Sequence, residues 1–253
     1  MLDFPPWSAR DAAAVWHPFT AMSAYQDEHA PVIAAADGFF LIDTAGKKYL
    51  DGHSSLWCNI RGHRVPEIDA ALRQQMDRVS HSTLLGLGNV PSIELAEELL
   101  QRVPSGLTRA FYADCGAAGV EVALKMAWQY HRQKPQPESR DVFACLDAAY
   151  HGDTVGTMSL GGIDRFHSLF GGLMFPALQL PSPATPGRSL EQCLAVTERV
   201  LTEQAGRIAG VIVEPLVQAA AGIRVHPPGY LSRLREITQR LGILLIADEI
   251  AVG

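Results

Sequence analysis

The 253-residue sequence has little of what marks membrane, secreted or nucleic-acid-binding proteins. Lysine and arginine number 21 against 27 acidic residues, which gives a formal net charge of -6. The only adjacent lysines are Lys47 and Lys48, too small a basic cluster to attract a phosphate backbone or an anionic membrane. No apolar run reaches bilayer length, and the opening MLDFPPWSAR is unlike a signal peptide. We therefore expect a cytoplasmic protein without nucleic-acid or membrane partners.

Metal-binding, redox and nucleotide-binding patterns are also missing. The cysteines, Cys58, Cys115, Cys145 and Cys193, form no C-x-x-C pair, and the nine histidines form no H-x-x-x-H or H-x-H pair. We expect no metal site and no disulfide framework, and at least three of the four thiols should be buried. Neither G-x-x-x-x-G-K-[ST] nor G-x-G-x-x-G is present, which argues against a P-loop NTPase and a dinucleotide-binding domain.

The N-terminal part reads as a small β structure followed by helices. Residues 32–51 hold two apolar runs around a turn at Asp43 and Gly46, which predicts a β-hairpin or meander. Four-residue apolar spacing predicts a helix that begins at about Pro66. A second helix is predicted from Ser92, whose side chain would cap it.

From residue 109, short apolar runs alternate with helical runs, the pattern of a mostly parallel α/β sheet. The predicted strands are 110–114, 141–147, 208–215 and 243–249, the predicted helices include 120–133 and 230–241, and the proline-rich residues 175–187 are predicted to form a surface loop. The last two strands are apolar until their final residues, which indicates burial on both faces. Sites in such sheets lie beyond the carboxyl ends of the strands.

Three features would meet at that edge. Residues 113–125, ADCGAAGVEVALK, form a turn of small residues and a helix start, which suits either an anion site or close packing against the sheet. Tyr150 follows a strand and could stack on a planar ligand or serve as a core aromatic. Asp248 and Glu249 end another strand, but no phosphate loop supports a nucleotide site. Together an anion site, an aromatic ring and a buried acid match the needs of pyridoxal phosphate.

Six segments carry a resemblance to a known family. They are WHPFTAMSAY (16–25), LDGHSSLWCNIRGH (50–63), DCGAAGVEVALKMA (114–127), YHGDT (150–154), VIVEPLVQAAAG (211–222) and LLIADEIAVG (244–253). In this order they resemble the class III pyridoxal-phosphate aminotransferases. The resemblance implies a fold-type I transferase, with residues 1–62 forming part of the small domain and residues 63–253 an incomplete large domain. It also implies a homodimer.

The first two segments are similar to members of this family that act in biotin biosynthesis. That similarity implies transfer of an amino group to 8-amino-7-oxononanoate, giving 7,8-diaminononanoate, with pyridoxal phosphate as cofactor. The amino donor would be S-adenosyl-L-methionine or lysine. Two alternatives stay open: another class III ω-aminotransferase, and a non-catalytic fragment that pairs with a full-length subunit.

The resemblance also assigns site residues. Asp248 would pair with the pyridine nitrogen, Gly116 and Ala117 would offer backbone N–H groups to the phosphate, Tyr150 would cover the ring and contact substrate, and Phe19 and Trp57 would line the substrate pocket. Asp153 and Glu214 are further candidates, without an assigned role. The sequence departs from the family pattern at Ala117, where a hydroxyl residue is usual, and at Leu56 and Phe19, where some members carry tryptophan and tyrosine.

The lysine that forms the Schiff base is not matched. The chain has four lysines, Lys47, Lys48, Lys125 and Lys134, and none follows Asp248 on a neighbouring strand as the family pattern requires. Lys125 lies four residues after Glu121, which predicts a surface ion pair. We therefore expect a C-terminally truncated form that does not catalyse transamination by itself, and its catalytic residue is unknown.

Overall fold

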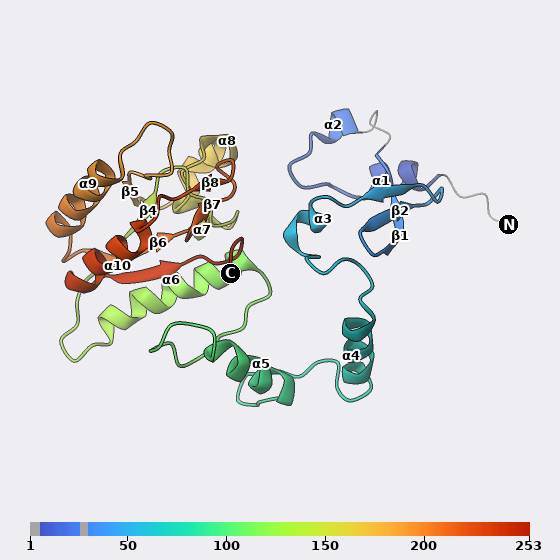
Figure 1. Ribbon diagram of the computed structural model, residues 1–253, viewed down its shortest axis with the longest axis horizontal. Coiled ribbons are helices and arrows are strands. Elements are labelled where there is room, and N and C mark those ends of the chain that lie inside the picture. The colour runs from blue at the N-terminus through green and yellow to red at the C-terminus, as the bar shows by residue number, and fades with distance from the viewer. Residues whose placement is uncertain (1–5, 26–29) are drawn as a thin grey trace. The chain divides into compact units, whose positions relative to one another are not determined.

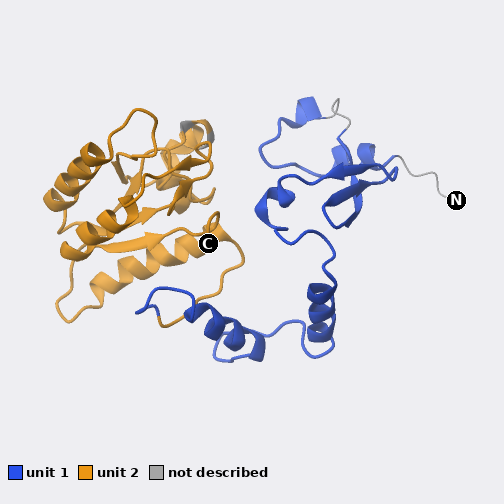
Figure 2. Ribbon diagram, in the orientation of Figure 1, with its two compact units in different colours: residues 1–107 blue, residues 108–253 orange. Residues whose placement is uncertain are grey.

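The computed structural model divides the chain into two compact units, residues 1–107 and 108–253 (Figure 2). It describes residues 6–25 and 30–253. None of the helices in these two ranges is both long and apolar enough to span a bilayer. The unit boundary differs from the domain boundary inferred at residues 62 and 63, and the assignment to small and large domains stays a prediction.

Unit 1 contains the predicted meander (Figure 1). Strands β1 (Ile33–Asp37), β2 (Phe40–Asp43) and β3 (Lys48–Leu50) pair in that order, all antiparallel. The Asp43 carboxylate holds the turn after β2, because it accepts hydrogen bonds from the backbone N–H groups of Ala45 and Lys47, both at 2.9 Å. The prediction of a β-hairpin or meander is confirmed.

The helices of unit 1 are α1 (Trp7–Ala14), α2 (Met22–Tyr25), α3 (Ser54–Trp57), α4 (Pro66–Met76) and α5 (Val90–Leu100). Helix α4 begins at the predicted proline. Helix α5 begins earlier than predicted, because Asn89 and not Ser92 is its cap: the Asn89 side chain accepts from the Ser92 N–H at 3.0 Å. The side-chain carbonyl of Asn89 accepts the kind of hydrogen bond that the hydroxyl oxygen of a capping serine accepts.

Unit 2 is built on a parallel sheet of strand order β5-β4-β6-β9. The strands are β4 (Val142–Leu146), β5 (Leu178–Leu180), β6 (Ile208–Val213) and β9 (Leu244–Ala247). The long helices are α6 (Gly116–Arg132), α9 (Leu190–Glu203) and α10 (Tyr230–Arg240); the short elements are α7 (Val155–Ser159), α8 (Asp164–His167), a 3-10 helix (Ser168–Leu173) and the strand pair β7 (Val217–Gln218) and β8 (Arg224–Val225).

Helices cover both faces of this sheet (Figure 1). Phe143 and Cys145 of β4 pack with the apolar side of α6, whereas their neighbours Ala144 and Leu146 pack with α9 and α10. This alternation follows from the two-residue period of a strand. The expected burial on both faces is confirmed for β6, whose six residues are all buried, and is wrong for β9 (Leu244–Ala247), whose residues are half-buried or exposed. The predicted α/β class is confirmed.

Three sequence predictions are wrong. Residues 110–114 form no strand, because no neighbouring strand in the described residues offers them a hydrogen-bonding partner. Residues 175–187 are not only a surface loop, since β5 lies within them and pairs with β4. Only two thiols are buried, Cys145 and Cys193, while Cys58 and Cys115 are exposed. Burial raises the pKa of the Cys145 thiol to about 12.

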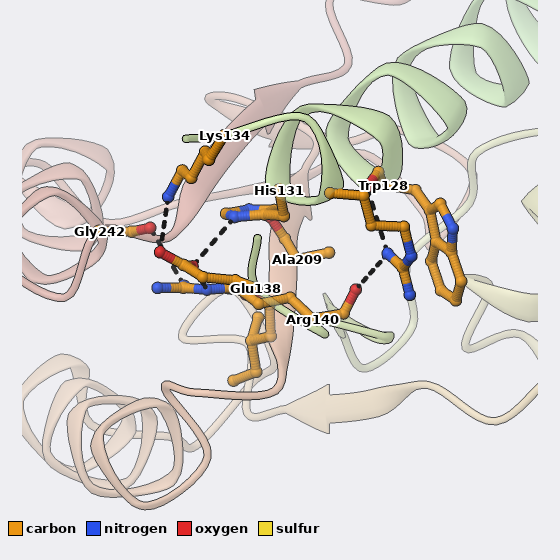
Figure 3. Close-up of polar contacts among 9 residues, drawn as sticks. Trp128, His131, Lys134, Glu138, Arg140, Ala209 and Gly242 are labelled. Carbon is orange, nitrogen blue, oxygen red and sulfur yellow. Dashed lines mark hydrogen bonds and ion pairs between the residues drawn. The ribbon is translucent and has the colours of Figure 1, made fainter. Parts of the chain in front are cut away.

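A polar network ties α6 to the amino ends of the strands (Figure 3). Arg140 donates to the carbonyls of Ile208, at 3.2 Å, and Gly242, at 3.1 Å, and its Nε donates to the Glu138 carboxylate at 2.6 Å. Glu138 also accepts from Lys134 at 2.9 Å. These donors hold the pKa of Glu138 at about 2, the Lys134 bond contributing most. The network joins the amino ends of β4, β6 and β9.

Candidate active site

Acidic side chains follow three neighbouring strands of the parallel sheet: Asp147 after β4, Glu214 after β6 and Asp248 after β9. Because these strands are parallel, their carboxyl ends share one edge, here called the rim. Asp147 is used in local structure, since its carboxylate accepts from the Ser182 N–H and pairs with Arg188. Glu214 and Asp248 lie between the loops that could form a site.

Asp248 is held by a buried histidine. Its Oδ2 lies 2.7 Å from Nδ1 of His151, and the exposed fractions of the two side chains are 6% and 0%. An ionised carboxylate can only accept, so the His151 Nδ1–H donates. Oδ1 of Asp248 accepts from the backbone N–H of Ile250 at 3.3 Å. The carboxylate therefore has a fixed orientation at the rim.

Tyr150 is fixed at both ends. Its backbone N–H donates to Oε1 of Glu214 at 3.0 Å, and its hydroxyl donates to Oδ2 of Asp153 at 2.5 Å. Its ring stacks on that of His167, with centroids 6.1 Å apart and an interplanar angle of 15°. Burial, followed by the bond to Asp153, raises the pKa of the Tyr150 phenol, which keeps it neutral. The aromatic ring is thus held in one place without a charge.

Glu214 connects two rim loops. Its Oε1 accepts from Tyr150 and its Oε2 accepts from the backbone N–H of Ala219 at 2.9 Å. Burial raises the pKa of this carboxyl, while the two backbone hydrogen bonds act in the opposite direction. These bonds show how Glu214 is held, and they stabilise the loops after β4 and β6 against each other.

The N-terminus of α6 meets the other two loops. A Cβ added to Gly116 would lie 2.7 Å from Cδ1 of Ile250, and one added to Gly152 would lie 2.7 Å from Cβ of Ala117. The segment after β9 and the loop after β4 therefore both pack against the first turn of α6. The Cys115 sulfur and carbonyl accept from Ala118 and Gly119, and helix geometry leaves the earlier N–H groups without intrahelical acceptors.

Gly152→Ala tests this packing. The substitution puts a methyl group against Ala117 at a position where φ is +119°, a conformation that side chains disfavour. We expect the free energy of unfolding to fall by about 1–3 kcal/mol, as measured by urea denaturation. Gly171→Ala is the matched control, because a Cβ there meets nothing within 4 Å. Equal stability of the two variants would contradict the packing described.

The expected ion pair between Glu121 and Lys125 is wrong. The Glu121 carboxylate instead accepts from the Thr154 hydroxyl at 2.6 Å and from the Gly156 N–H at 2.9 Å. It thereby satisfies an orphan N–H at the start of α7, an interaction that is stronger than an exposed helix pair. Lys125 is exposed on α6.

Phe19 and Trp57, the residues expected in the substrate pocket, both belong to unit 1. Both are exposed and both have positive φ, 51° and 70°. Trp57 ends a run of four residues, Ser54–Trp57, that all have φ between 49° and 70°. Each L-residue in this left-handed conformation costs about 1–2 kcal/mol, so the run must be held by its surroundings.

A family model for class III aminotransferases matches residues 21–253. The chain belongs to the class III aminotransferases. It is 50% identical to the adenosylmethionine-8-amino-7-oxononanoate aminotransferase of Nitratidesulfovibrio vulgaris, a match that covers 96% of this chain and 46% of the relative. The enzyme of the same name from Staphylococcus aureus is 43% identical, with 96% and 56% covered.

Solved structures of this family share the fold. The crystal structure of adenosylmethionine-8-amino-7-oxononanoate aminotransferase from Methanocaldococcus jannaschii matches with a TM-score of 0.91 and 38% identity, covering 97% of this chain and 55% of that one. A PLP-bound amine transaminase from an uncultivated Pseudomonas species matches with a TM-score of 0.85 and 35% identity, covering 95% and 56%. The fold-type I assignment is confirmed. The chain spans about half the length of these class III relatives.

Two contacts at the rim were not predicted from the sequence. His151 has no predicted role in the YHGDT segment, although it is the side chain that holds Asp248. A histidine next to Tyr150 in the sequence indicates a further polar side chain at the rim. Its partner Asp248 could not be identified from the sequence, because it lies 97 residues away. Glu121, expected to pair along its own helix, in fact reaches the loop before α7.

Proposed function

We propose that this chain forms the cofactor-binding part of an aminotransferase that uses pyridoxal phosphate and converts 8-amino-7-oxononanoate to 7,8-diaminononanoate in biotin biosynthesis. The observation that carries the proposal is the meeting of three loops at one rim, through the contacts of His151 with Asp248 and of Gly152 with Ala117. The names of the relatives at 50% and 43% identity support the choice of substrate.

The residues at the rim fit this cofactor. Gly116 and Ala117 place no side chain larger than a methyl group at the positive end of α6, which suits a phosphate. A buried carboxylate, Asp248, suits a protonated pyridine nitrogen, and the fixed ring of Tyr150 suits an aromatic face. Ala117 has no hydroxyl, so its contribution to the phosphate would come from the backbone N–H alone.

Each residue would have a defined task. The bound cofactor supplies a ring that accepts electrons from the carbon that loses its proton. Asp248 would accept the pyridinium N–H and keep that nitrogen protonated, with His151 fixing the angle of the carboxylate. Asp153 would hold the Tyr150 hydroxyl in place beside the substrate. Glu214 would act by fixing the backbone of Tyr150.

The other assignments also belong to this proposal. Phe19 and Trp57 would line the oxononanoate pocket, and the protein would work as a homodimer in the cytoplasm. Adenosylmethionine, named in the relatives, is the favoured donor, with lysine as the alternative. Residues 1–62 would belong to the small domain and 63–253 to the large one.

Titration with pyridoxal phosphate tests the proposal. Of the lysines in unit 2, Lys125 is exposed on α6 and Lys134 pairs with Glu138 at the amino end of the sheet, opposite the rim. We therefore expect one cofactor bound per chain, reversibly, and little lysine adduct after borohydride reduction, as read by mass spectrometry. A stoichiometric adduct at Lys47, Lys48, Lys125 or Lys134 would contradict this.

The similarity to an amine transaminase favours a second candidate, another class III ω-aminotransferase. Calorimetry of the chain loaded with pyridoxamine phosphate separates the two. Tighter binding of 8-amino-7-oxononanoate than of the aldehyde derived from 4-aminobutyrate supports the biotin-pathway substrate, and the reverse order supports the second candidate.

A further inference from the structure

The backbone around Trp57 is unusual for L-residues. Ser54, Ser55, Leu56 and Trp57 have φ values of 50°, 49°, 63° and 70°, which form one left-handed turn. Single residues visit this region, but runs are rare because each Cβ crowds the following carbonyl. Hydrogen bonds within the turn, such as the Trp57 N–H donating to the His53 carbonyl at 2.8 Å, are local. A group outside the turn is needed to hold it.

The Asp51 carboxylate provides that hold. Its Oδ1 accepts from the Ser55 N–H and its Oδ2 from the Ser55 hydroxyl, both at 2.8 Å. His63 Nε2 lies 2.8 Å from the same Oδ2. The Asp51 side chain is only 8% exposed. These three donors, led by the Ser55 N–H, lower the pKa of Asp51 to about 2, so the carboxylate is ionised at neutral pH.

Asp51 and His63 are themselves fixed to the meander of unit 1. The Asp51 N–H donates to the Phe39 carbonyl at 2.8 Å, and the His63 N–H donates to the Gly38 carbonyl at 2.7 Å. Gly62 lets the chain approach this closely, because a Cβ there would lie 2.7 Å from the Gly38 oxygen. A continuous set of contacts therefore runs from the β1–β2 turn to Ser55.

The turn presents two apolar side chains. Leu56 is 73% exposed and Trp57 is 47% exposed, although both sit on backbone fixed by the contacts above. Strained conformations of this kind occur where a side chain must be held in one direction for function. We propose that Asp51 is a positioning residue that, through Ser55, maintains the left-handed turn and so sets where Leu56 and Trp57 meet the substrate. The substrate contact of Trp57 rests on the proposed function; the hold on the turn does not.

The full 253-residue chain can be tested by NMR. Asp51→Ala removes the acceptor for Ser55, so the Ser55 amide should exchange at least about 10-fold faster and the Trp57 indole N–H resonance should shift. Trp57→Phe assigns that resonance among the four tryptophans. Asp43→Ala is the matched control, because Asp43 holds the β2–β3 turn in the same unit with the same kind of bonds. It should leave both signals unchanged.

A rescue variant separates positioning from general stability. Glycine adopts positive φ without the Cβ penalty, so Ser54→Gly added to Asp51→Ala should return the indole resonance toward its original position while Ser55 exchange stays fast. An unshifted indole in Asp51→Ala, or no recovery in the double variant, overturns the proposal. Ser54→Gly alone should keep the native resonance, which shows that the variant folds.

A binding measurement tests whether the position of the turn affects substrate binding. The affinity for 8-amino-7-oxononanoate should fall in Asp51→Ala and recover in the double variant. If the unaltered chain does not bind this ketone, the proposed function fails, and the exchange and indole signals still decide whether Asp51 holds the turn.

Discussion

Replacing Asp248 by alanine is expected to lower the affinity of the chain for pyridoxal phosphate by about 10- to 100-fold, the effect of losing a hydrogen bond to a charged group. The substitution also leaves His151 buried without its partner, since Nδ1 bonds to Asp248 and Nε2 has no hydrogen-bond partner among the described residues. Equilibrium titration followed by absorbance measures the change.

Asp141→Ala is the matched control for Asp248→Ala. Asp141 lies at the amino end of β4 and pairs with Arg207 at an exposed position, so its loss should leave cofactor affinity unchanged. The cofactor affinity of Asp248→Asn should lie between those of Asp248→Ala and Asp141→Ala. The amide keeps the shape of the carboxylate, but it carries no negative charge to pair with a pyridinium. Equal affinities of the native chain and Asp248→Ala for pyridoxal phosphate would show that Asp248 does not contact the cofactor.

Arg140→Ala is expected to lower the free energy of unfolding by about 3 kcal/mol, the largest stability effect anticipated in unit 2. The change leaves the carbonyls of Ile208 and Gly242 without the donor that Arg140 supplies, and it separates Glu138 from a largely buried cation. Urea denaturation followed by circular dichroism measures it.

Lys134→Ala is the control within the same network. Lys134 and Glu138 are 25% and 37% exposed, so their ion pair is screened by solvent and its loss should cost no more than about 1 kcal/mol. If the two variants unfold at the same urea concentration, Arg140 does not join the amino ends of the strands as described.

The same network predicts a pH dependence. The pKa of Glu138 is lowered from 4.5 to about 2, so the carboxylate contributes stability above pH 4.5 that is lost as the pH falls toward 2. The difference in free energy of unfolding between the native chain and Arg140→Ala should therefore become smaller as the pH falls from 4.5 toward 2. A difference that stays constant from pH 5 to pH 2.5 would show that the Glu138 contact does not contribute.

The sequence allowed the sheet and its rim to be predicted because burial leaves a direct trace. Strand β6 is apolar along its whole length, and Glu214 and Asp248 mark where the two apolar runs end. Strand β5 has no comparable apolar run in the sequence, because it has only three residues in a proline-rich stretch. Its pairing with β4 determines its structure. Residues 110–114 have the composition of a strand but form none, because composition alone does not supply a neighbouring strand to pair with.

Polar contacts between distant segments were the hardest to predict. The left-handed turn at Ser54–Trp57 runs against the propensity of its own residues, and the Asp51 carboxylate that bonds to Ser55 is also bound by His63, 12 residues along the chain. Glu121 has a partner on its own helix at the usual spacing, yet it bonds 33 and 35 residues away. Spacing in the sequence could not show either choice, because the competing acceptors and donors meet only in the folded chain.

A crystal structure of the chain with pyridoxamine phosphate shows whether the rim holds the cofactor, since this ligand needs no lysine to be held. We expect the phosphate at the backbone N–H groups of Gly116 and Ala117, the pyridine nitrogen against Asp248 and the ring beside Tyr150. Ligand density elsewhere on the chain, with the Asp248 carboxylate bonded only to His151 and Ile250, would contradict this expectation.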